Sequence, residues 1–479
     1  MIYDIAIIGA GIIGSLIAQK LSKYNIKTCL IDKETEPAQG AVKANSAIIH
    51  AGYDALPGTL KAYYNIKGNE IFQNICDELE IELKNIGSMV LSLDKYGDES
   101  VKELYKRGID NKVKHLEIIG KQEILQYEPN VNSDVRLALY SKSASIVSPY
   151  ELTIAAAENA IENGVDSIFD FNVKKIKQKG NIFEISSNDH DCEDEDKNNI
   201  KTVQSKYIIN CAGVKADEIA NEPEFKIMPR KGEYFVLDKK QDGFINHILF
   251  SPPTEKGKGI LACPTVHGNI ILGPTSEFIE NKENKDTTYD GMQSVKQKVK
   301  QILPGINFNN IITSFSGIRA TPNTHDFYIG WSKVYQNFIN VAGIESPGLT
   351  SAPAIAKKII DMMCETDILK DKKENFVKRK KPIIISDLNF EEKNKLIKNN
   401  PKYGKIVCRC ENISEGEIID AIRRNTARTV DGIKHRIRPG MGRCQGSFCV
   451  TKVMEILSKE LKIPINKITK KGKNSRMVM

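Results

Sequence analysis

The sequence predicts an α/β fold that opens with a dinucleotide-binding βαβ unit and ends in a separate, small, cysteine-bearing domain. Three observations support this. A mostly apolar run at residues 3–8 is followed by Gly9, Gly11 and Gly14 and by a helix-like repeat at 15–24. Helical and short strand patterns then alternate as far as residue 365. Four of the ten cysteines gather between positions 408 and 449.

The first unit has the spacing of a phosphate-binding turn. Gly9 permits the tight turn, Gly11 lets a pyrophosphate approach the backbone, and Gly14 lets helix and strand pack closely. The helix N-terminus then presents free N–H groups to the phosphates. A second strand at 28–31 ends at Asp32, where an acid would bind ribose hydroxyls.

The remaining elements follow from periodicity and turn residues. Residues 150–163 and 352–363 are predicted helices, and 226–274 is predicted to be rich in strands. Further strands are expected at 167–176, 180–186, 207–210 and 337–341, a polar surface loop at 188–199, a charged linker at 366–400, and a compact domain at 401–479.

Composition places the chain among globular proteins, with 41% hydrophobic and 27% charged residues in 479. The net charge of +8 comes largely from lysines in the last third, best explained by a solvated linker; contact with a membrane or an acidic partner is the alternative. Nucleic acid is not expected, because the basic run belongs to no known nucleic-acid-binding fold motif. With no signal peptide and no apolar stretch of spanning length, we expect a cytoplasmic protein. Peripheral attachment at the inner face of the membrane is compatible with this.

The layout favours FAD over NAD. An NAD dehydrogenase would continue with regular βα units after Asp32. This chain instead has a distant strand leading into Ala212 and Gly213, and a late glycine-rich segment at 343–350. That segment would offer backbone N–H groups to the flavin ring and stabilise its reduced anion.

At this point residues 1–365 resemble the D-amino-acid-oxidase-like FAD-dependent oxidoreductases. The subgroup most similar to them is the anaerobic glycerol-3-phosphate dehydrogenase large subunit with the L-2-hydroxyglutarate oxidases. The matching stretches are 7–14 with Asp32, 45–52, 209–213, 229–234, 316–319 and 343–350.

The resemblance implies a Rossmann-like FAD domain interleaved with a substrate domain built on a mixed or antiparallel sheet. The substrate domain would take in residues 76–140 and 226–312. The implied FAD-binding residues are Gly9, Gly11, Gly14, Asp32, Ser46, Val173, Ala212, Gly213, Gly343, Gly348, Leu349 and Thr350.

The clustered cysteines predict a metal site. Cys408-x-Cys410 and Cys444-x4-Cys449 offer four thiolates in an expected reducing compartment, which indicates zinc or an iron–sulfur cluster. The tight Cys-x-Cys pair fits one iron of a 2Fe–2S cluster better than zinc. The region around 401–460 also resembles the bacterioferritin-associated-ferredoxin-like domain, which implies a small helical domain holding 2Fe–2S.

Several residues have both a structural and a catalytic interpretation. Arg319 is predicted to clamp an anionic substrate, because a guanidinium binds carboxylate or phosphate in a bidentate way. Arg230 and Lys231 are alternatives for that role. His50 and Tyr234 are predicted to lie beside the flavin, although each also suits a structural position.

The predicted reaction is oxidation of a small anionic 2-hydroxy compound, with sn-glycerol 3-phosphate as the leading substrate and dihydroxyacetone phosphate as the product. An L-2-hydroxyglutarate or amino-acid dehydrogenase or oxidase, and a non-catalytic electron-transfer subunit, are the alternatives. A one-electron cluster behind a two-electron flavin predicts delivery to another protein, either an electron-accepting flavoprotein or a membrane-anchoring subunit.

Overall fold

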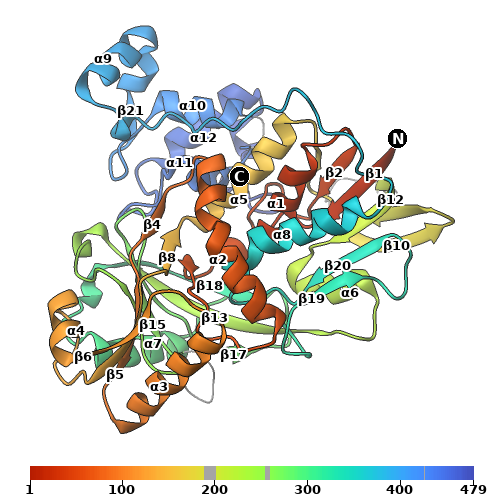
Figure 1. Cartoon of the computed structure of the whole chain (residues 1–479). Helices are drawn as coiled ribbons and strands as arrows, with labels where there is room; N and C mark the ends of the chain where they lie inside the picture. Colours follow the sequence, from red (N-terminus) through yellow and green to blue (C-terminus); the bar gives the residue numbers. More distant parts are fainter. Residues whose placement is uncertain (188–200, 254–258, 425–426, 479) are drawn as a thin grey trace.

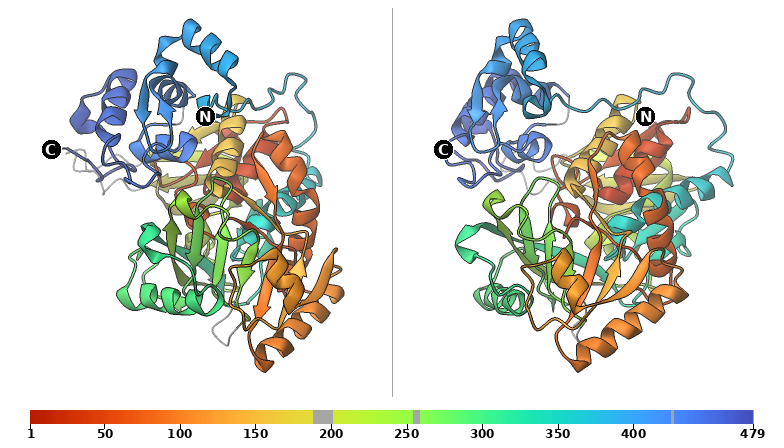
Figure 2. Two further views of the ribbon diagram at one scale, coloured as in Figure 1. Left: turned by 90° about the vertical axis from the view of Figure 1, so that its left-hand side faces the viewer. Right: turned by 60° about the vertical axis from the view of Figure 1, so that its left-hand side comes forward.

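The computed structural model describes residues 1–187, 201–253, 259–424 and 427–478. Two large sheets and their helices form the body of the molecule, and the C-terminal domain stands against one side of it (Figures 1 and 2). The predicted fold class is confirmed. The polar stretch expected to form a loop at 188–199 lies outside the described residues.

The first sheet has a parallel centre in the order β9-β2-β1-β12, and β20 also pairs parallel with β12. The antiparallel strands β10 and β11 extend it beyond β12, and β19 pairs antiparallel with β20. Residues Ile5–Ile8 are at most 4% exposed, as expected for a strand covered on both faces. The strands are β1 (Ile2–Ile8), β2 (Thr28–Ile31), β9 (Asp166–Ile168), β10 (Val173–Lys179), β11 (Ile182–Ser187), β12 (Lys201–Asn210), β19 (Tyr328–Trp331) and β20 (Phe338–Ala342).

The single strand expected at 167–176 is two strands, and this prediction was wrong. Asp170 adopts a φ of 55°, and the N–H groups of Asp170 and Phe171 donate to the carbonyls of Glu34 and Asp32. The chain therefore turns away from β2 after β9 and begins β10 against β11.

One apolar core joins this sheet to helices α1 (Ile12–Leu21), α5 (Pro149–Glu162), α8 (Gly348–Cys364) and α2 (Leu60–Glu78). At Gly68 of α2, an added Cβ would lie 1.9 Å from the Thr350 carbonyl oxygen, so only glycine lets α2 meet α8 this closely. A small sheet of β3 (Ile48–Ile49), β8 (Ser145–Val147) and β4 (Leu83–Asn85) lies nearby.

The second sheet is mostly antiparallel and takes its strands from two separate parts of the chain. Helices α3 (Lys95–Asp110), α4 (Lys121–Tyr127) and α7 (Tyr289–Ile302) accompany it. Its strands are β5 (Ser88–Ser92), β6 (Leu116–Gly120), β7 (Leu137–Ser141), β13 (Ile227–Leu237), β14 (Ile248–Phe250), β15 (Leu261–Pro264), β16 (Ile270–Gly273), β17 (Glu277–Phe278) and β18 (Ile311–Pro322). The long β13–β18 ribbon belongs to this sheet, but Ile227 and Ala320 at its end pack in the core of the first sheet. It therefore places side chains between the two sheets.

The C-terminal domain is small and helical, with its own apolar core. It contains α9 (Phe390–Asn399), β21 (Ile406–Cys408), β22 (Ile413–Ser414), α10 (Glu415–Arg423), α11 (Val430–Ile437) and α12 (Val450–Leu461). The stretch expected to be a linker, 366–400, contains α9 and is tied to α5, since the Val377 N–H donates to Asn163. The exact domain boundaries stay a prediction. No helix in the described ranges is both long and apolar enough to cross a membrane.

Candidate active site and cluster site

The glycine turn after β1 brings the backbone to the edge of a large cavity. Gly9 has a φ of 109°, and a Cβ there would lie 2.3 Å from the Cys211 carbonyl oxygen. A Cβ on Gly14 would lie 1.9 Å from the Gly9 oxygen, so Gly14 sets the distance between helix and strand. Gly11 has no heavy atom within 4 Å of such a Cβ and lines the cavity. The turn thus leaves open space beside the N-terminus of α1, where a pyrophosphate fits.

Asp32 lies beside this turn at the end of β2. Its carboxylate accepts hydrogen bonds from the backbone N–H groups of Ala10 (2.6 Å) and Glu34 (2.9 Å). Burial raises the pKa of the Asp32 carboxyl to about 6, although these two hydrogen bonds oppose the shift. The carboxyl lines the cavity and suits a ribose hydroxyl.

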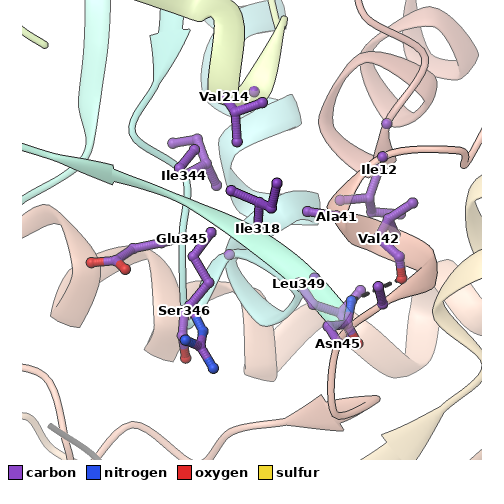
Figure 3. Close-up of a pocket in the computed structure, with 18 of the residues that line it drawn as sticks. Ile12, Ala41, Val42, Asn45, Val214, Ile318, Ile344, Glu345, Ser346 and Leu349 are labelled. Carbon is purple, nitrogen blue, oxygen red and sulfur yellow. Dashed lines mark hydrogen bonds between the residues drawn. The ribbon is translucent and has the colours of Figure 1, made fainter. Parts of the chain in front are cut away.

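The cavity has a volume of about 810 Å³ and lies between the two sheets. Figure 3 shows Ile318, Ile344 and Leu349 opposite Ile12 and Val42 across it. Twelve of the predicted site residues line this one cavity: Gly9, Gly11, Asp32, Ser46, His50, Val173, Ala212, Gly213, Tyr234, Arg319, Gly348 and Leu349. The structure therefore brings together residues from nearly the whole length of the flavin part of the chain.

Gly14, Gly343 and Thr350 do not line the cavity among the described residues. Gly343 has a φ of 67° and lies against Pro322, where a Cβ would be 2.7 Å from the proline ring. The Thr350 hydroxyl accepts the His50 backbone N–H at 2.9 Å. These residues shape the walls of the site and hold its segments together.

Cations gather on the cavity wall around one acid. Lys61 Nζ and Arg230 Nη2 lie 2.7 and 2.6 Å from the two carboxylate oxygens of Glu345, whose side chain is 6% exposed. Burial opposes ionisation of Glu345, but these two cations hold the pKa of its carboxyl below the usual value. Arg319 lies opposite Arg230 in the β13–β18 register, and its guanidinium reaches the Thr275 carbonyl only at 3.4 to 3.5 Å. In the part of the chain described, Arg319 has no carboxylate partner, so this wall carries excess positive charge.

Sequence reasoning missed Lys61 and Glu345. Glu345 stood inside the late glycine-rich segment, and its position there was the only available signal. Lys61 begins α2, 284 residues away from Glu345, with no local motif. Lys231, an alternative to Arg319, is 3% exposed and lies within 3.7 Å of Glu233 rather than in the cavity.

His50 and Tyr234 occupy the cavity wall with their backbones held in place. The His50 carbonyl accepts hydrogen bonds from Asn65 at 2.9 Å and from Asn69 at 3.2 Å. Tyr234 is 4% exposed and stacks on Phe315, with ring centroids 4.9 Å apart. The arrangement presents a histidine to the same cavity as the cations, with Tyr234 as a fixed aromatic surface.

The four clustered cysteines come together from two loops. Cys410 Sγ and Cys444 Sγ lie 3.5 Å apart, and Cys408 and Cys449 share a hydrogen bond. That bond, helped by backbone N–H groups, lowers the pKa of Cys408 to about 6, which favours the thiolate that binds metal. The thiols form two pairs, a set that suits a two-iron cluster. These pairs join the two loops, so sharing of one iron by Cys408 and Cys410 stays a prediction.

A buried ion network fastens the cluster domain to the flavin domain. Arg436, 3% exposed, contacts Glu36 at 2.8 Å and Glu158 at 2.7 Å. Glu36 also accepts hydrogen bonds from the N–H groups of Arg428 and Thr429 at the start of α11. The helix N-terminus and Arg436 together compensate the buried carboxylates.

A second set of contacts ties the same domain to α5 and to Asn269 in the turn between β15 and β16. Arg438 bonds Glu411 next to the cysteines at 2.9 Å and donates to the Tyr150 hydroxyl at 3.1 Å. Tyr150 packs with Val42, which lines the cavity. Side chains in contact thus run from the cavity wall to the cysteine site.

This site and fold define a flavin-dependent oxidoreductase. Residues 4–362 match the FAD dependent oxidoreductase family model, and the chain belongs to that family. Residues 406–459 match the BFD-like [2Fe-2S] binding domain. The predicted family, FAD and the 2Fe–2S cluster are confirmed.

Three similar proteins narrow the kind of oxidoreductase that this chain resembles. A glycerol 3-phosphate dehydrogenase of Caloramator mitchellensis is 44% identical over 99% of this chain and 97% of its own length. A glycerol 3-phosphate oxidase of Mycoplasma genitalium is 33% identical over 75% of this chain and 94% of its own. The FAD-bound L-alpha-glycerophosphate oxidase from Mycoplasma pneumoniae superposes with a TM-score of 0.71 at 28% identity, covering 78% of this chain and 97% of that one.

Proposed function

We propose that this protein oxidises sn-glycerol 3-phosphate to dihydroxyacetone phosphate and delivers the electrons through its cluster to a partner. The observation that carries the proposal is the cation-rich wall: among the residues that the structure describes, Arg319 has no carboxylate partner, while Arg230 and Lys61 share Glu345. A phosphate dianion would neutralise the excess charge. The 44% identical relative named as a glycerol 3-phosphate dehydrogenase supports the same substrate.

The residues then have separate tasks. Arg319 binds the substrate phosphate with its planar fork and orients the C2 hydroxyl toward His50. His50 accepts the hydroxyl proton, a role that suits an imidazole near neutral pH. Thr350, Asn65 and Asn69 hold the His50 backbone and so position the ring.

The two groups divide the electron chemistry. FAD held at Gly9, Gly11 and Asp32 would supply the two-electron oxidant for C2. Oxidation of the C2 hydroxyl would release two protons in all, one of them accepted by His50. A 2Fe–2S cluster carries one electron at a time, so its presence favours a protein acceptor over direct reaction with O₂. The partner is an electron-accepting flavoprotein or a membrane-anchoring subunit in this proposal.

The deciding experiment is anaerobic stopped-flow with a substrate panel. Glycerol 3-phosphate should bleach the flavin absorbance at least about a hundredfold more efficiently than L-2-hydroxyglutarate or amino acids, because only it carries a phosphate. His50→Asn should slow bleaching while leaving FAD content unchanged. Faster bleaching by L-2-hydroxyglutarate would make that compound the preferred substrate. If no compound bleached the flavin, the result would favour a non-catalytic electron-transfer subunit.

A further inference from the structure

Positive charge is distributed very unevenly along the chain. Residues 401–479 contain 18 Lys and Arg against 7 Asp and Glu, a net charge of +11. Residues 1–365 contain 41 basic against 48 acidic residues, a net charge of −7. The cluster domain is therefore strongly cationic, whereas the flavoenzyme part is anionic.

The charged side chains exposed on the cysteine loops, residues 408–411 and 441–449, are also positive. Both loops lie wholly within the described residues. Their exposed residues are Arg409, Cys410, Arg443, Ser447 and Phe448. Glu411, the one acid of these loops, is 4% exposed and bound by Arg438 and Lys239.

Phe448 has no packing role that explains its position. Its side chain is 87% exposed, immediately before Cys449, whereas Cys449 itself is 2% exposed. Exposed aromatic residues and arginines are enriched at the centre of protein interfaces, and Arg409 and Arg443 are exposed on the same two loops. Cys410 at the surface also means that an acceptor docked here would approach the cluster closely.

We infer that the exposed face of the cysteine loops (Arg409, Cys410, Arg443 and Phe448) is the docking surface for an acidic electron-accepting protein. The inference rests on the relay role proposed above. Arg443 lies 3.4 Å from Asp238 but its side chain stays 59% exposed. Arg409 and this exposed part of Arg443 attract carboxylates on the partner and steer the encounter, and Phe448 inserts into the partner's surface. A protein fits better than a lipid surface, because one isolated aromatic residue is a small anchor for a bilayer and lipid accepts no electron.

The electron balance requires two encounters for each substrate. Oxidation of the substrate supplies two electrons and two protons. Each docked one-electron acceptor takes one electron from the reduced cluster, and the protons pass to solvent. Two acceptor molecules are therefore reduced per substrate molecule oxidised.

The test compares an acidic and a basic acceptor, cytochrome b5 and cytochrome c, with the full-length holoprotein. Protein reduced with dithionite and freed of excess reductant should reduce cytochrome b5 with a second-order rate constant that falls about tenfold or more as salt rises from low to high, whereas that for cytochrome c should not fall. Calorimetric titration of the oxidised proteins measures the same association without turnover. Because dithionite supplies the electrons, the result does not depend on the substrate.

Arg409→Glu and Phe448→Ala should each weaken cytochrome b5 binding and slow its reduction about tenfold, with iron content and flavin bleaching unchanged. Lys467→Glu is the matched control, because Lys467 is exposed and follows the far end of α12, away from the cysteine loops. Equal losses in the control, or no loss in either variant, would overturn the inference. So would variants that release the protein from phosphatidylglycerol vesicles while leaving cytochrome b5 reduction intact, since the face would then bind membrane. Loss of substrate-driven bleaching with normal dithionite-driven transfer would instead refute only the proposed function.

Discussion

The flavin cavity and the cysteine site are built in opposite ways. The cavity takes its lining from Ile8 to Leu349, through both sheets and the loops between them. The cysteine site takes its four thiols from two loops within one small helical domain. A distributed site depends on the packing of the whole body, whereas a compact one depends mainly on its own domain. The two should therefore be separable by mutation, except at the network that joins them.

Gly11→Val should have the largest effect of the variants that affect the flavin cavity but not the cysteine site. Among the described residues, no heavy atom lies within 4 Å of the added Cβ, so the fold should survive. The side chain would instead enter the space that the pyrophosphate needs. We expect nearly complete loss of FAD with iron content unchanged, measured by flavin absorbance and iron analysis. Gly120→Val is the matched control, because Gly120 is also a helix N-cap with open space around it but lies outside the cavity. Full flavin absorbance in Gly11→Val would show that the FAD pyrophosphate does not bind at this turn.

Cys444→Ser should have the converse effect, loss of the cluster with FAD retained. Anaerobically purified wild-type protein should hold about two irons per chain, and the variant far less, because one thiolate ligand is gone. FAD content and substrate bleaching should remain. Cys364→Ser, at an exposed cysteine outside the loops, is the control. Zinc without acid-labile sulfide in the wild type would contradict the cluster assignment.

Within the cavity, Arg319→Ala should lower kcat/KM for glycerol 3-phosphate by about a hundredfold or more, through loss of a charge-assisted bidentate contact. Arg319→Lys should not restore it, because an ammonium lacks the planar fork. Arg136→Ala is the control: Arg136 directly precedes β7 of the same sheet, and neither it nor its partner Asp98 lines the cavity, so the change should have little effect. Unaltered kinetics in Arg319→Ala would indicate that Arg230, rather than Arg319, binds the substrate phosphate.

The junction between the two regions should respond to Arg436→Gln. Removing this arginine takes away the ion-pair partner that the buried Glu36 and Glu158 share, a change that costs about 3 kcal/mol or more. The unfolding temperature of the cluster domain should fall. Electron transfer from flavin to cluster should slow, while bleaching of the flavin by substrate persists. Arg423→Gln, in an exposed pair with Glu460, should cost under about 1 kcal/mol. Equal effects of the two variants would show that the network does not fasten the domains.

The smallest effect concerns Asp32, whose pKa burial raises to about 6. An acid with a raised folded-state pKa destabilises the FAD-free protein as the pH rises toward that value. Ribose hydroxyls donate to the ionised form, so FAD affinity should increase with pH through about 6, by about tenfold or less. Fluorescence titration with FAD across this range measures it. Asp32→Asn should abolish the dependence, and a persistent one would place the titrating group elsewhere.

The sequence alone determined the features that local chemistry demands. Gly9, Gly11 and Gly14 were identifiable because a phosphate turn needs their backbone freedom at that spacing. The cysteines were identifiable because a metal site needs thiolates in close sequence pairs. The α/β class followed from apolar strands covered on both faces, such as β1.

Only the tertiary structure decided which distant residues meet. Lys61 and Glu345 form one ion pair although α2 and the segment before α8 are far apart in sequence, and Arg436 reaches back to Glu36. The tertiary structure also places Gly343 and Thr350 behind the cavity lining, where they support it. Such pairings depend on how sheets and helices pack, and no local periodicity encodes which two charged side chains will be buried against each other.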